Sequence, residues 1–310
     1  MTRAWAFDQP VPPRGYCWWY VDALSDDGRH GITLIAFIGT VFSPWYALAR
    51  RGGGGDPENH CCLNVALYGN PRRWAMTDRR RDALKRDADH LEIGPSSLDW
   101  DGETLTIRIE ETTAPIPSRL SGTVRLRPQA LSERRFQLDA DGRHHWQPIA
   151  ARSRVEVEFT SPALRWSGPA YFDTNSGSAP LEQDFISWDW CRAPMAEATA
   201  VLYNAQRRDG SAQSLALRVG RDGVVEDFPP PPRVDLPKTL WRIARPTRSE
   251  TGTARVVRSL EDTPFYSRSE IRTHLLGQEA TAVHESLSLD RFRSPTMYAM
   301  LPFKVPRPLR

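Results

Sequence analysis

The chain has 310 residues, of which 25% are charged and 40% hydrophobic, and its formal net charge is +3. This length allows two packed domains or one large β-rich domain, and the composition is that of an ordinary globular protein. A net charge so near zero gives no support to a polyanionic partner, so we expect no nucleic acid among the partners. The first thirteen residues contain no apolar stretch of the kind that secretory signals carry, so we expect no such signal.

The first informative segment is Trp18-Trp19-Tyr20-Val21-Asp22, which is aromatic and ends in a carboxylate. Residues i and i+2 of an extended strand share a face, so Trp18, Tyr20 and Asp22 are expected on one side. An aromatic face with a single carboxylate suits a deep apolar pocket that handles a proton or a positive charge. We therefore take these three residues as candidate substrate-binding residues, and Asp22 also as the second candidate acid.

The longest uncharged run follows at residues 31–49 and is rich in β-branched and aromatic residues. Gly39 and Pro44 interrupt it, which favours two buried strands, at residues 32–38 and around residues 41–46. The run is barely long enough to span a membrane, and no other segment could accompany a spanning helix. A third interpretation keeps Pro44-Trp45-Tyr46 as an exposed loop that dips into a membrane interface, where aromatic residues are enriched.

The four cysteines show no ligand spacing. Cys61 and Cys62 are adjacent, while Cys17 and Cys191 are far from them and from any Cys/His run. We expect no metal site, and we expect reduced, buried thiols in an intracellular protein.

Short strand-like stretches with turn signals between them recur along the rest of the chain, and helical periodicity is weak and confined to residues 79–87. Such spacing is typical of barrels or sandwiches and not of an α/β sheet. Residues 52–55 predict a flexible glycine loop, and residues 229–232 a stiff polyproline connector. The expected strands lie at residues 63–68, 105–110, 122–126, 136–138, 155–159, 200–205, 214–219, 254–257 and 282–287.

Two further pairs alternate in the same way, His144 with Trp146 and Tyr171 with Asp173. Each has an ordinary structural explanation beside a functional one. A strand histidine is often a surface or hydrogen-bonded residue, aromatic residues fill β cores, and the sequence after Tyr171 also fits a strand-ending Asx turn. The residues alone leave both interpretations open.

The last cluster is Trp188-Asp189-Trp190. Asp189 alternates away from its neighbours, so we expect the two rings to be buried and Asp189 to be a buried partner of an arginine. Trp188 and Trp190 are also candidate substrate-binding residues.

Four segments together resemble the carotenoid 1,2-hydratases, also called hydroxyneurosporene synthases. They are residues 18–22, residues 31–44, Tyr171-Phe172-Asp173-Thr174-Asn175 and Trp188-Asp189-Trp190-Cys191-Arg192-Ala193. The resemblance covers nearly the whole chain and implies an all-β fold of two lipocalin-like β-barrels in tandem, expected at residues 1–163 and 164–310 and meeting near residues 160–195. The wider group often has Asn-Trp-Gly after its acidic residue, whereas this chain has Asn175-Ser176-Gly177.

The resemblance implies a hydro-lyase that adds water across the terminal double bond of acyclic carotenes such as lycopene or neurosporene, without a cofactor. Its functional positions correspond to His144, Trp146, Tyr171 and Asp173 as the catalytic residues. A carboxylic acid in an apolar pocket can deliver the proton, and we expect Asp173 to do so. Trp146 and Tyr171 would present ring faces to the carbocation, and His144 would polarise Asp173 or accept a proton from water.

A substrate dissolved in lipid predicts a peripheral enzyme on the cytoplasmic side of the inner or intracytoplasmic membrane. The expected partners are therefore an acyclic carotenoid, water and the membrane surface, with Arg50 and Arg51 beside the aromatic loop attracting anionic lipid. Two alternatives remain open, a non-catalytic carotenoid- or lipid-binding lipocalin and an intramolecular cyclase on the same fold.

Overall fold

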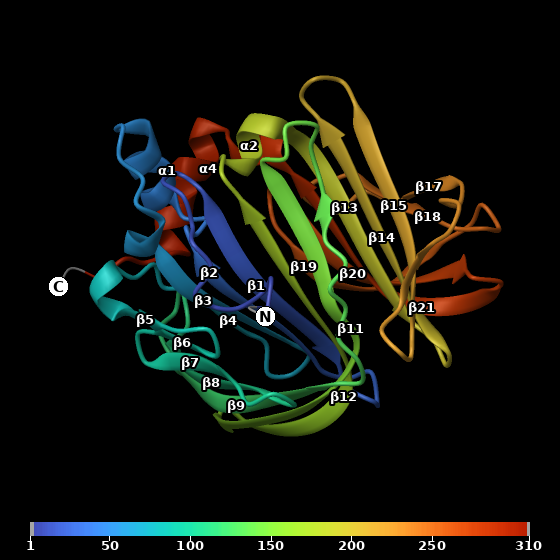
Figure 1. Cartoon of the computed structure of the whole chain (residues 1–310), viewed down its shortest axis with the longest axis horizontal. Helices are drawn as coiled ribbons and strands as arrows, with labels where there is room; N and C mark the ends of the chain where they lie inside the picture. Colours follow the sequence, from blue (N-terminus) through green and yellow to red (C-terminus); the bar gives the residue numbers. More distant parts are fainter. Residues whose placement is uncertain (1–2, 309–310) are drawn as a thin grey trace. The chain divides into compact units, whose positions relative to one another are not determined.

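The computed structural model describes residues 3–308, and strands make up most of its regular structure (Figure 1). The expected predominantly β architecture is confirmed. The described chain forms two compact units: unit 1 takes the chain up to Pro180 and again from Ala299, and unit 2 takes Leu181–Tyr298. The observed division therefore lies after residue 180 and not after residue 163, and the chain returns to unit 1 at its end.

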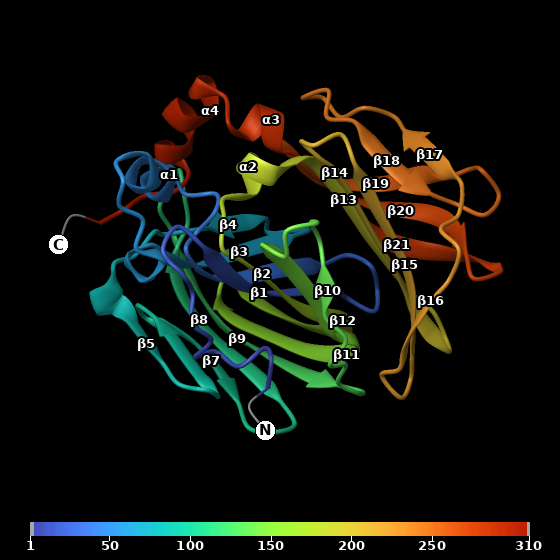
Figure 2. The ribbon, with the colours of Figure 1, turned by 45° about the horizontal axis from the view of Figure 1, so that its top comes forward.

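Unit 1 is built on one curled antiparallel sheet, in the order β4-β3-β2-β1-β12-β11-β9-β8-β7-β6-β5, with β10 paired to β11 (Figure 2). The strand β12 lies between β1 and β11, near the middle of this sheet, which is why a boundary at residue 163 is wrong. The turn that precedes β12 closes a long hairpin and is not a linker. The strands are β1 (Tyr16–Leu24), β2 (Gly31–Ile38), β3 (Cys61–Tyr68), β4 (Arg73–Ala75), β5 (Leu84–Arg86), β6 (His90–Ile93), β7 (Ser96–Trp100), β8 (Leu105–Thr112), β9 (Arg119–Pro128), β10 (Phe136–Gln137), β11 (His144–Ser161) and β12 (Ala163–Gly177).

The apolar core of unit 1 lies on one face of this sheet. Alternate residues of the central strands enter it, among them Trp19 and Val21 of β1 and Phe172 of β12, together with the Trp5 and Phe7 side chains. Because side chains alternate along a strand, the intervening residues of β1 and β12 lie on the other face.

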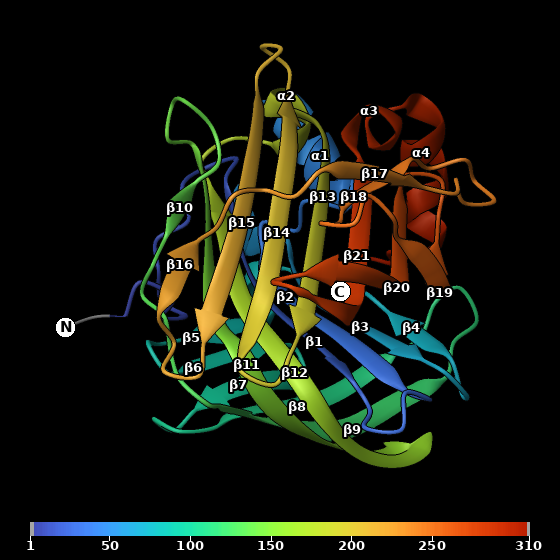
Figure 3. The same cartoon turned by 90° about the vertical axis from the view of Figure 1, so that its right-hand side faces the viewer.

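Unit 2 holds a second antiparallel sheet in the order β16-β15-β14-β13-β21-β20-β19, and a separate hairpin pairs β17 with β18 (Figure 3). Its core cluster is small, with Cys191, Leu202 and Ile271 among several alanines. The strands are β13 (Phe185–Pro194), β14 (Ala198–Arg207), β15 (Ala212–Gly220), β16 (Val225–Asp227), β17 (Arg233–Leu236), β18 (Arg245–Arg248), β19 (Arg255–Asp262), β20 (Tyr266–Leu275) and β21 (Gln278–Ser288).

Helices are short. They are the α-helices α1 (Pro44–Arg51), α2 (Leu181–Asp184), α3 (Leu289–Phe292) and α4 (Pro295–Met300), and the 3-10 helices η1 (Pro57–Asn59), η2 (Arg81–Ala83) and η3 (Leu301–Phe303). Within residues 3–308, none of the helices is long and apolar enough to cross a membrane.

Most strand predictions are confirmed, but the second strand expected around residues 41–46 is wrong. A helix, α1, begins there instead, because Pro44 suits the first helical position and the Ser43 hydroxyl accepts hydrogen bonds from the Trp45 and Tyr46 N–H groups. The third interpretation, an exposed loop at Pro44-Trp45-Tyr46, is wrong as well. Tyr46 is fully buried and its hydroxyl donates to Gly15 O, while the half-buried Trp45 donates its indole N–H to Val305 O.

The weak helical periodicity at residues 79–87 does not correspond to an α-helix. That segment forms only η2 and the short strand β5. β5 pairs with β6, so the edge of the sheet overrides a weak helical periodicity. The glycine loop at residues 52–55 and the proline segment at residues 229–232 both lie outside regular helices and strands, as expected.

Candidate functional site

Three neighbouring strands of unit 1 bring seven candidate residues onto one face of the sheet. In the pairing of β1 with β12, Tyr20 lies opposite Asp173 and Asp22 opposite Tyr171. Residues directly opposite each other on paired strands point to the same side. All seven are buried, none more than 6% exposed: Trp18, Tyr20, Asp22, His144, Trp146, Tyr171 and Asp173.

This candidate face is the one that turns away from the core of unit 1. The residues between its members, such as Trp19 and Phe172, belong to the core cluster. The candidate residues therefore do not line the apolar interior of the unit 1 sheet. They form a second buried surface, which is aromatic but contains two carboxylates and an imidazole.

Asp173 is held by Trp146 from the neighbouring strand. The Trp146 Nε1–H group donates to Asp173 Oδ2 over 2.9 Å, and Asp173 is 4% exposed. The Trp146 ring lies beside Phe136, with ring centroids 5.4 Å apart. The prediction was that Trp146 presents its ring face to the carbocation. The structure adds that the Trp146 N–H group is a direct hydrogen-bond partner of the candidate acid.

A bulge in β11 makes this contact possible. Trp146 pairs with Asn175 on the candidate face, but Ala150, four residues later, pairs with Phe172 on the core face. An even spacing in a regular strand would keep both on one side, so the irregularity between Gln147 and Ala150 reverses the alternation.

His144 is positioned by Tyr16, a residue that the sequence analysis missed. The Tyr16 hydroxyl and His144 Nδ1 are 2.9 Å apart, and the two rings are nearly parallel with centroids 5.9 Å apart. They meet over Gly177 of β12, which pairs with both residues. A Cβ atom on Gly177 would lie 2.6 Å from Tyr16 Cε1 and 2.7 Å from His144 Nδ1, so only glycine leaves room for this contact.

Aromatic rings continue along the face. Tyr16 stacks on Trp18 with ring centroids 4.9 Å apart, and Tyr20 meets Tyr171 edge to face at 6.2 Å. The alternation of Trp18 and Tyr20 extends back to Tyr16 at the same spacing, and this was the available signal for it.

Asp22 lies fully buried at the other end of the face, opposite Tyr171 on β12 and Thr33 on β2. Asp22 and Asp173 are diagonal neighbours across the β1–β12 pair. The structure thus keeps both candidate acids on the candidate face.

Trp188 and Trp190 belong to unit 2 and are buried, as expected, at 9% and 4% exposure. They lie on the face of β13 opposite the one that carries Cys191 into the core of unit 2. The Trp188 ring contacts Phe185 and Tyr203 at centroid distances of 6.3 and 6.5 Å.

The expectation that Asp189 pairs with an arginine is wrong. Its Oδ1 atom accepts a hydrogen bond from the Ser286 hydroxyl over 2.5 Å. Strand alternation turns Asp189 to the core side with Cys191, whereas Arg192 points to the opposite face. Burial raises the pKa of Asp189 to about 7, although the hydrogen bond from Ser286 lowers it.

The four cysteines are buried free thiols. Burial raises the pKa of Cys17 and of Cys191 to about 12, so neither thiol ionises readily. In the part of the chain that the structure describes, no group of three or more His, Cys, Asp or Glu side chains could hold a metal ion.

Comparison with known proteins places the chain in a family. Residues 34–310 match the family model described as carotenoid hydratase CrtC. The acyclic carotenoid 1,2-hydratase of Thiocapsa roseopersicina is 58% identical over 99% of this chain and 76% of its own length. The enzymes of the same name from Rubrivivax gelatinosus and Cereibacter sphaeroides are 53% and 44% identical, covering 97% and 88% of this chain and 75% and 98% of their own.

Two solved structures are similar in fold alone. A putative AttH from Nitrosomonas europaea has a TM-score of 0.58 at 15% identity, covering 88% of this chain and 92% of its own. CghA has a TM-score of 0.52 at 11% identity, covering 92% of this chain and 96% of its own.

The buried acid of unit 2 predicts a pH-dependent stability. Because the pKa of Asp189 is raised in the folded state, the folded chain binds more protons than the unfolded chain between about pH 4 and about pH 7. The contribution of Asp189 to stability therefore falls as pH rises through that window. Asp189→Asn should stabilise the protein by on the order of a few kcal/mol at about pH 8 and by little at about pH 4.

Urea unfolding at the two pH values measures this difference. Asp209→Asn is the control in the same unit. Hydrogen bonds donated by Ser211 lower the pKa of the exposed Asp209 carboxyl, which predicts a change of stability with pH of the opposite sign. A gain for Asp189→Asn that is equal at both pH values would show that Asp189 ionises normally in the folded state.

Proposed function

The chain belongs to the carotenoid hydratase CrtC family, and we propose that Asp173 is the acid with which this hydratase adds water to the terminal 1,2 double bond of an acyclic carotenoid. The observation that carries the proposal is the buried Asp173 carboxyl on an aromatic face, fixed by the Trp146 N–H group.

The reaction sets the chemistry that the site must supply. A proton adds to the less substituted carbon of the double bond, and the π electrons form the new C–H bond. The neighbouring carbon becomes a tertiary carbocation, and a water oxygen bonds to it and releases a proton. No electrons are gained or lost overall, so we propose that the reaction needs no redox cofactor.

Asp173 suits the first step because burial favours the neutral form of a carboxyl group. An indole N–H can only donate, so Asp173 Oδ2 is the acceptor in its contact with Trp146. This arrangement favours the acidic proton on Oδ1. Asp22 is the second candidate for the same role because it is buried on the same face.

The rings around Asp173 suit the second step. The faces of Trp146 and Tyr171 can stabilise a desolvated carbocation by about 1–2 kcal/mol each. The Tyr20 ring adds to the same aromatic wall. We propose Trp18, Tyr20, Asp22, Trp188 and Trp190 as the substrate-binding residues.

His144 suits the last step. If its Nδ1–H group donates to the Tyr16 oxygen, Nε2 carries a lone pair that can accept the proton of the attacking water. Tyr16 would then be a positioning residue that selects the tautomer, and Gly177 keeps the two rings in reach of each other.

Two alternatives use other chemistry. A carotenoid- or lipid-binding lipocalin needs no acid on its buried face, and a cyclase would need the cation captured by another double bond. The paired Asp173–Trp146 and His144–Tyr16 contacts favour the hydratase over both.

We also propose that the two units are lipocalin-like barrels in tandem. The curled meander of unit 1 and the seven-stranded meander of unit 2 support this, as does the fold shared with the putative AttH structure.

Finally, we propose that the protein works as a peripheral protein on the cytoplasmic side of the inner or intracytoplasmic membrane. Burying a ten-carbon chain end stabilises the complex by roughly 8 kcal/mol relative to water, at about 0.8 per carbon. Relative to lipid this gain nearly vanishes, so an enzyme at the membrane surface draws in only the end of the carotenoid.

The proposed addition is tested by incubating the protein with lycopene or neurosporene in oxygen-labelled, deuterated water. We expect a mass gain of one or two waters, with the labelled oxygen on the tertiary carbon and deuterium on the adjacent carbon. An unlabelled hydroxyl from molecular oxygen would contradict the mechanism. A product of unchanged mass would indicate the cyclase, and no product would indicate the binder.

The role of Asp173 is tested with Asp173→Asn, which keeps the size of the side chain and can still accept from Trp146. We expect turnover to fall by at least roughly a hundredfold, because the general acid is lost, with little change in the unfolding midpoint. Asp22→Asn is the comparison variant, because Asp22 is the second candidate acid and is buried on the same face. If Asp22→Asn abolishes turnover and Asp173→Asn does not, the two residues exchange roles.

A further inference from the structure

Unit 1 exposes large apolar side chains on two segments that are far apart in sequence. Leu48 of α1 is 65% exposed, and Met300 and Phe303 at the end of the chain are 47% and 76% exposed. Figures 1 and 2 both draw α1 beside the C-terminal segment that contains η3, and these two elements are in contact. Trp45 and Leu48 are three residues apart and share a side of α1, and Trp45 donates to Val305 O over 2.8 Å, which places Leu48 beside this segment.

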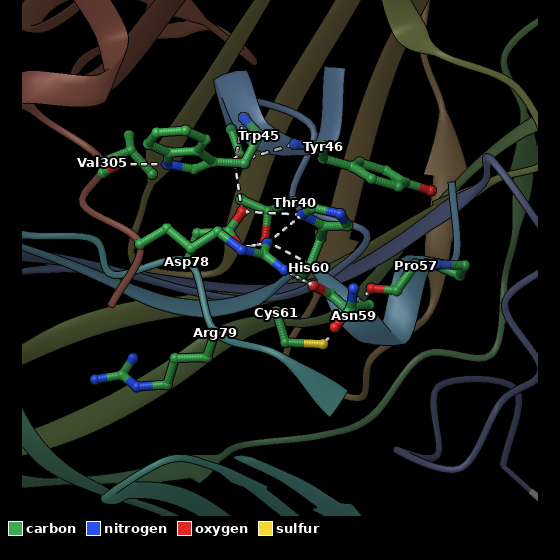
Figure 4. Close-up of polar contacts among 12 residues, drawn as sticks. Thr40, Trp45, Tyr46, Pro57, Asn59, His60, Cys61, Asp78, Arg79 and Val305 are labelled. Carbon is green, nitrogen blue, oxygen red and sulfur yellow. Dashed lines mark hydrogen bonds and ion pairs between the residues drawn. The ribbon is translucent and has the colours of Figure 1, made fainter. Parts of the chain in front are cut away.

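A buried network fixes the two elements in one arrangement (Figure 4). The Ser43 hydroxyl that caps α1 also donates to Asp78, and the fully buried Asp78 accepts from Arg307 of the C-terminal segment. Arg307 donates further to Asn59 O over 3.0 Å, and the Asp78 N–H donates to Pro306 O over 3.0 Å. The exposed side chains therefore belong to two segments that this network holds in a fixed arrangement.

The charged side chains of these two segments are all cations. Arg51 ends α1 and Lys304 follows Phe303, and both are exposed. Residues 43–55 and 299–308 contain no Asp or Glu. The Lys304 ammonium lies 4.4 Å from the centroid of the Trp74 ring, a cation–π contact that positions this side chain.

We propose that these five residues, Leu48, Arg51, Met300, Phe303 and Lys304, form a docking platform for an anionic lipid bilayer. The apolar side chains would enter the boundary between headgroups and acyl chains, and the two cations would lie at the level of the lipid phosphates. A bilayer fits this combination, because exposed aliphatic and aromatic ends with flanking cations suit a fluid, negatively charged surface. The inference rests on the proposed function, since the carotenoid is dissolved in such a bilayer.

The test is flotation of the full-length protein with vesicles of phosphatidylcholine containing about one-third phosphatidylglycerol. We expect Leu48→Ser with Phe303→Ser to reduce binding by at least roughly tenfold, because two apolar side chains no longer insert. Ile116→Ser is the control, since Ile116 is 81% exposed in unit 1 on the loop between β8 and β9. Arg51→Gln with Lys304→Gln should weaken binding to the anionic vesicles and leave binding to pure phosphatidylcholine unchanged.

The platform is overturned if the Leu48/Phe303 variant floats like the wild type, or if Ile116→Ser loses binding equally. Wild-type protein that floats with neither vesicle would also overturn it, and a protein partner would then be the occupant of this surface. Hydration of carotenoid in detergent micelles is measured in parallel, where the variant should match the wild type. An inactive wild type that still binds vesicles would contradict the hydratase and leave the platform standing.

Discussion

The pairing of β12 with β1 on one side and β11 on the other is the constraint on which the site depends. Asp173 and Tyr171 alternate with Phe172, and Phe172 belongs to the apolar core. A slip of one residue in this register would bury Asp173 in that core and turn Phe172 toward His144 and Trp146. The core therefore selects the register, and the register gathers the acid, the imidazole and the rings on one face.

Two local departures from regular β structure refine this arrangement. The bulge in β11 lets Trp146 stay on the candidate face while the strand continues into the core at Ala150. The missing side chain of Gly177 lets the Tyr16 and His144 rings meet across the strand between them. The chemistry that we propose needs both, because the Trp146 N–H group orients the acid and Tyr16 orients the imidazole.

Much of the site could be predicted from the sequence, because two-residue alternation assigns faces within a strand without any tertiary information. The alternation placed Tyr171 and Asp173 on one face of their strand, and His144 and Trp146 on one face of theirs. It also located nearly all the strands. It could not predict which strands become neighbours, so the Trp146–Asp173 contact, Tyr16 and the bulge were missed. The α1 segment was misread because its β-branched composition outweighed the capping signal of Ser43 and Pro44. The Asp189 partner was misread because Ser286 comes from β21, a neighbouring strand that is far away in the sequence.

The proposed mechanism requires that Asp173 be a neutral carboxylic acid before the substrate arrives. Infrared difference spectra of wild type against Asp173→Asn at about pH 7 measure this directly, because a protonated carboxyl absorbs at a frequency distinct from that of a carboxylate. Other buried acids, such as Asp189, are common to both proteins and cancel in the difference. We expect a protonated-carboxyl band that is present in the wild type and absent from the variant. A carboxylate band in its place would mean that Asp173 is ionised at neutral pH and cannot be the proton donor.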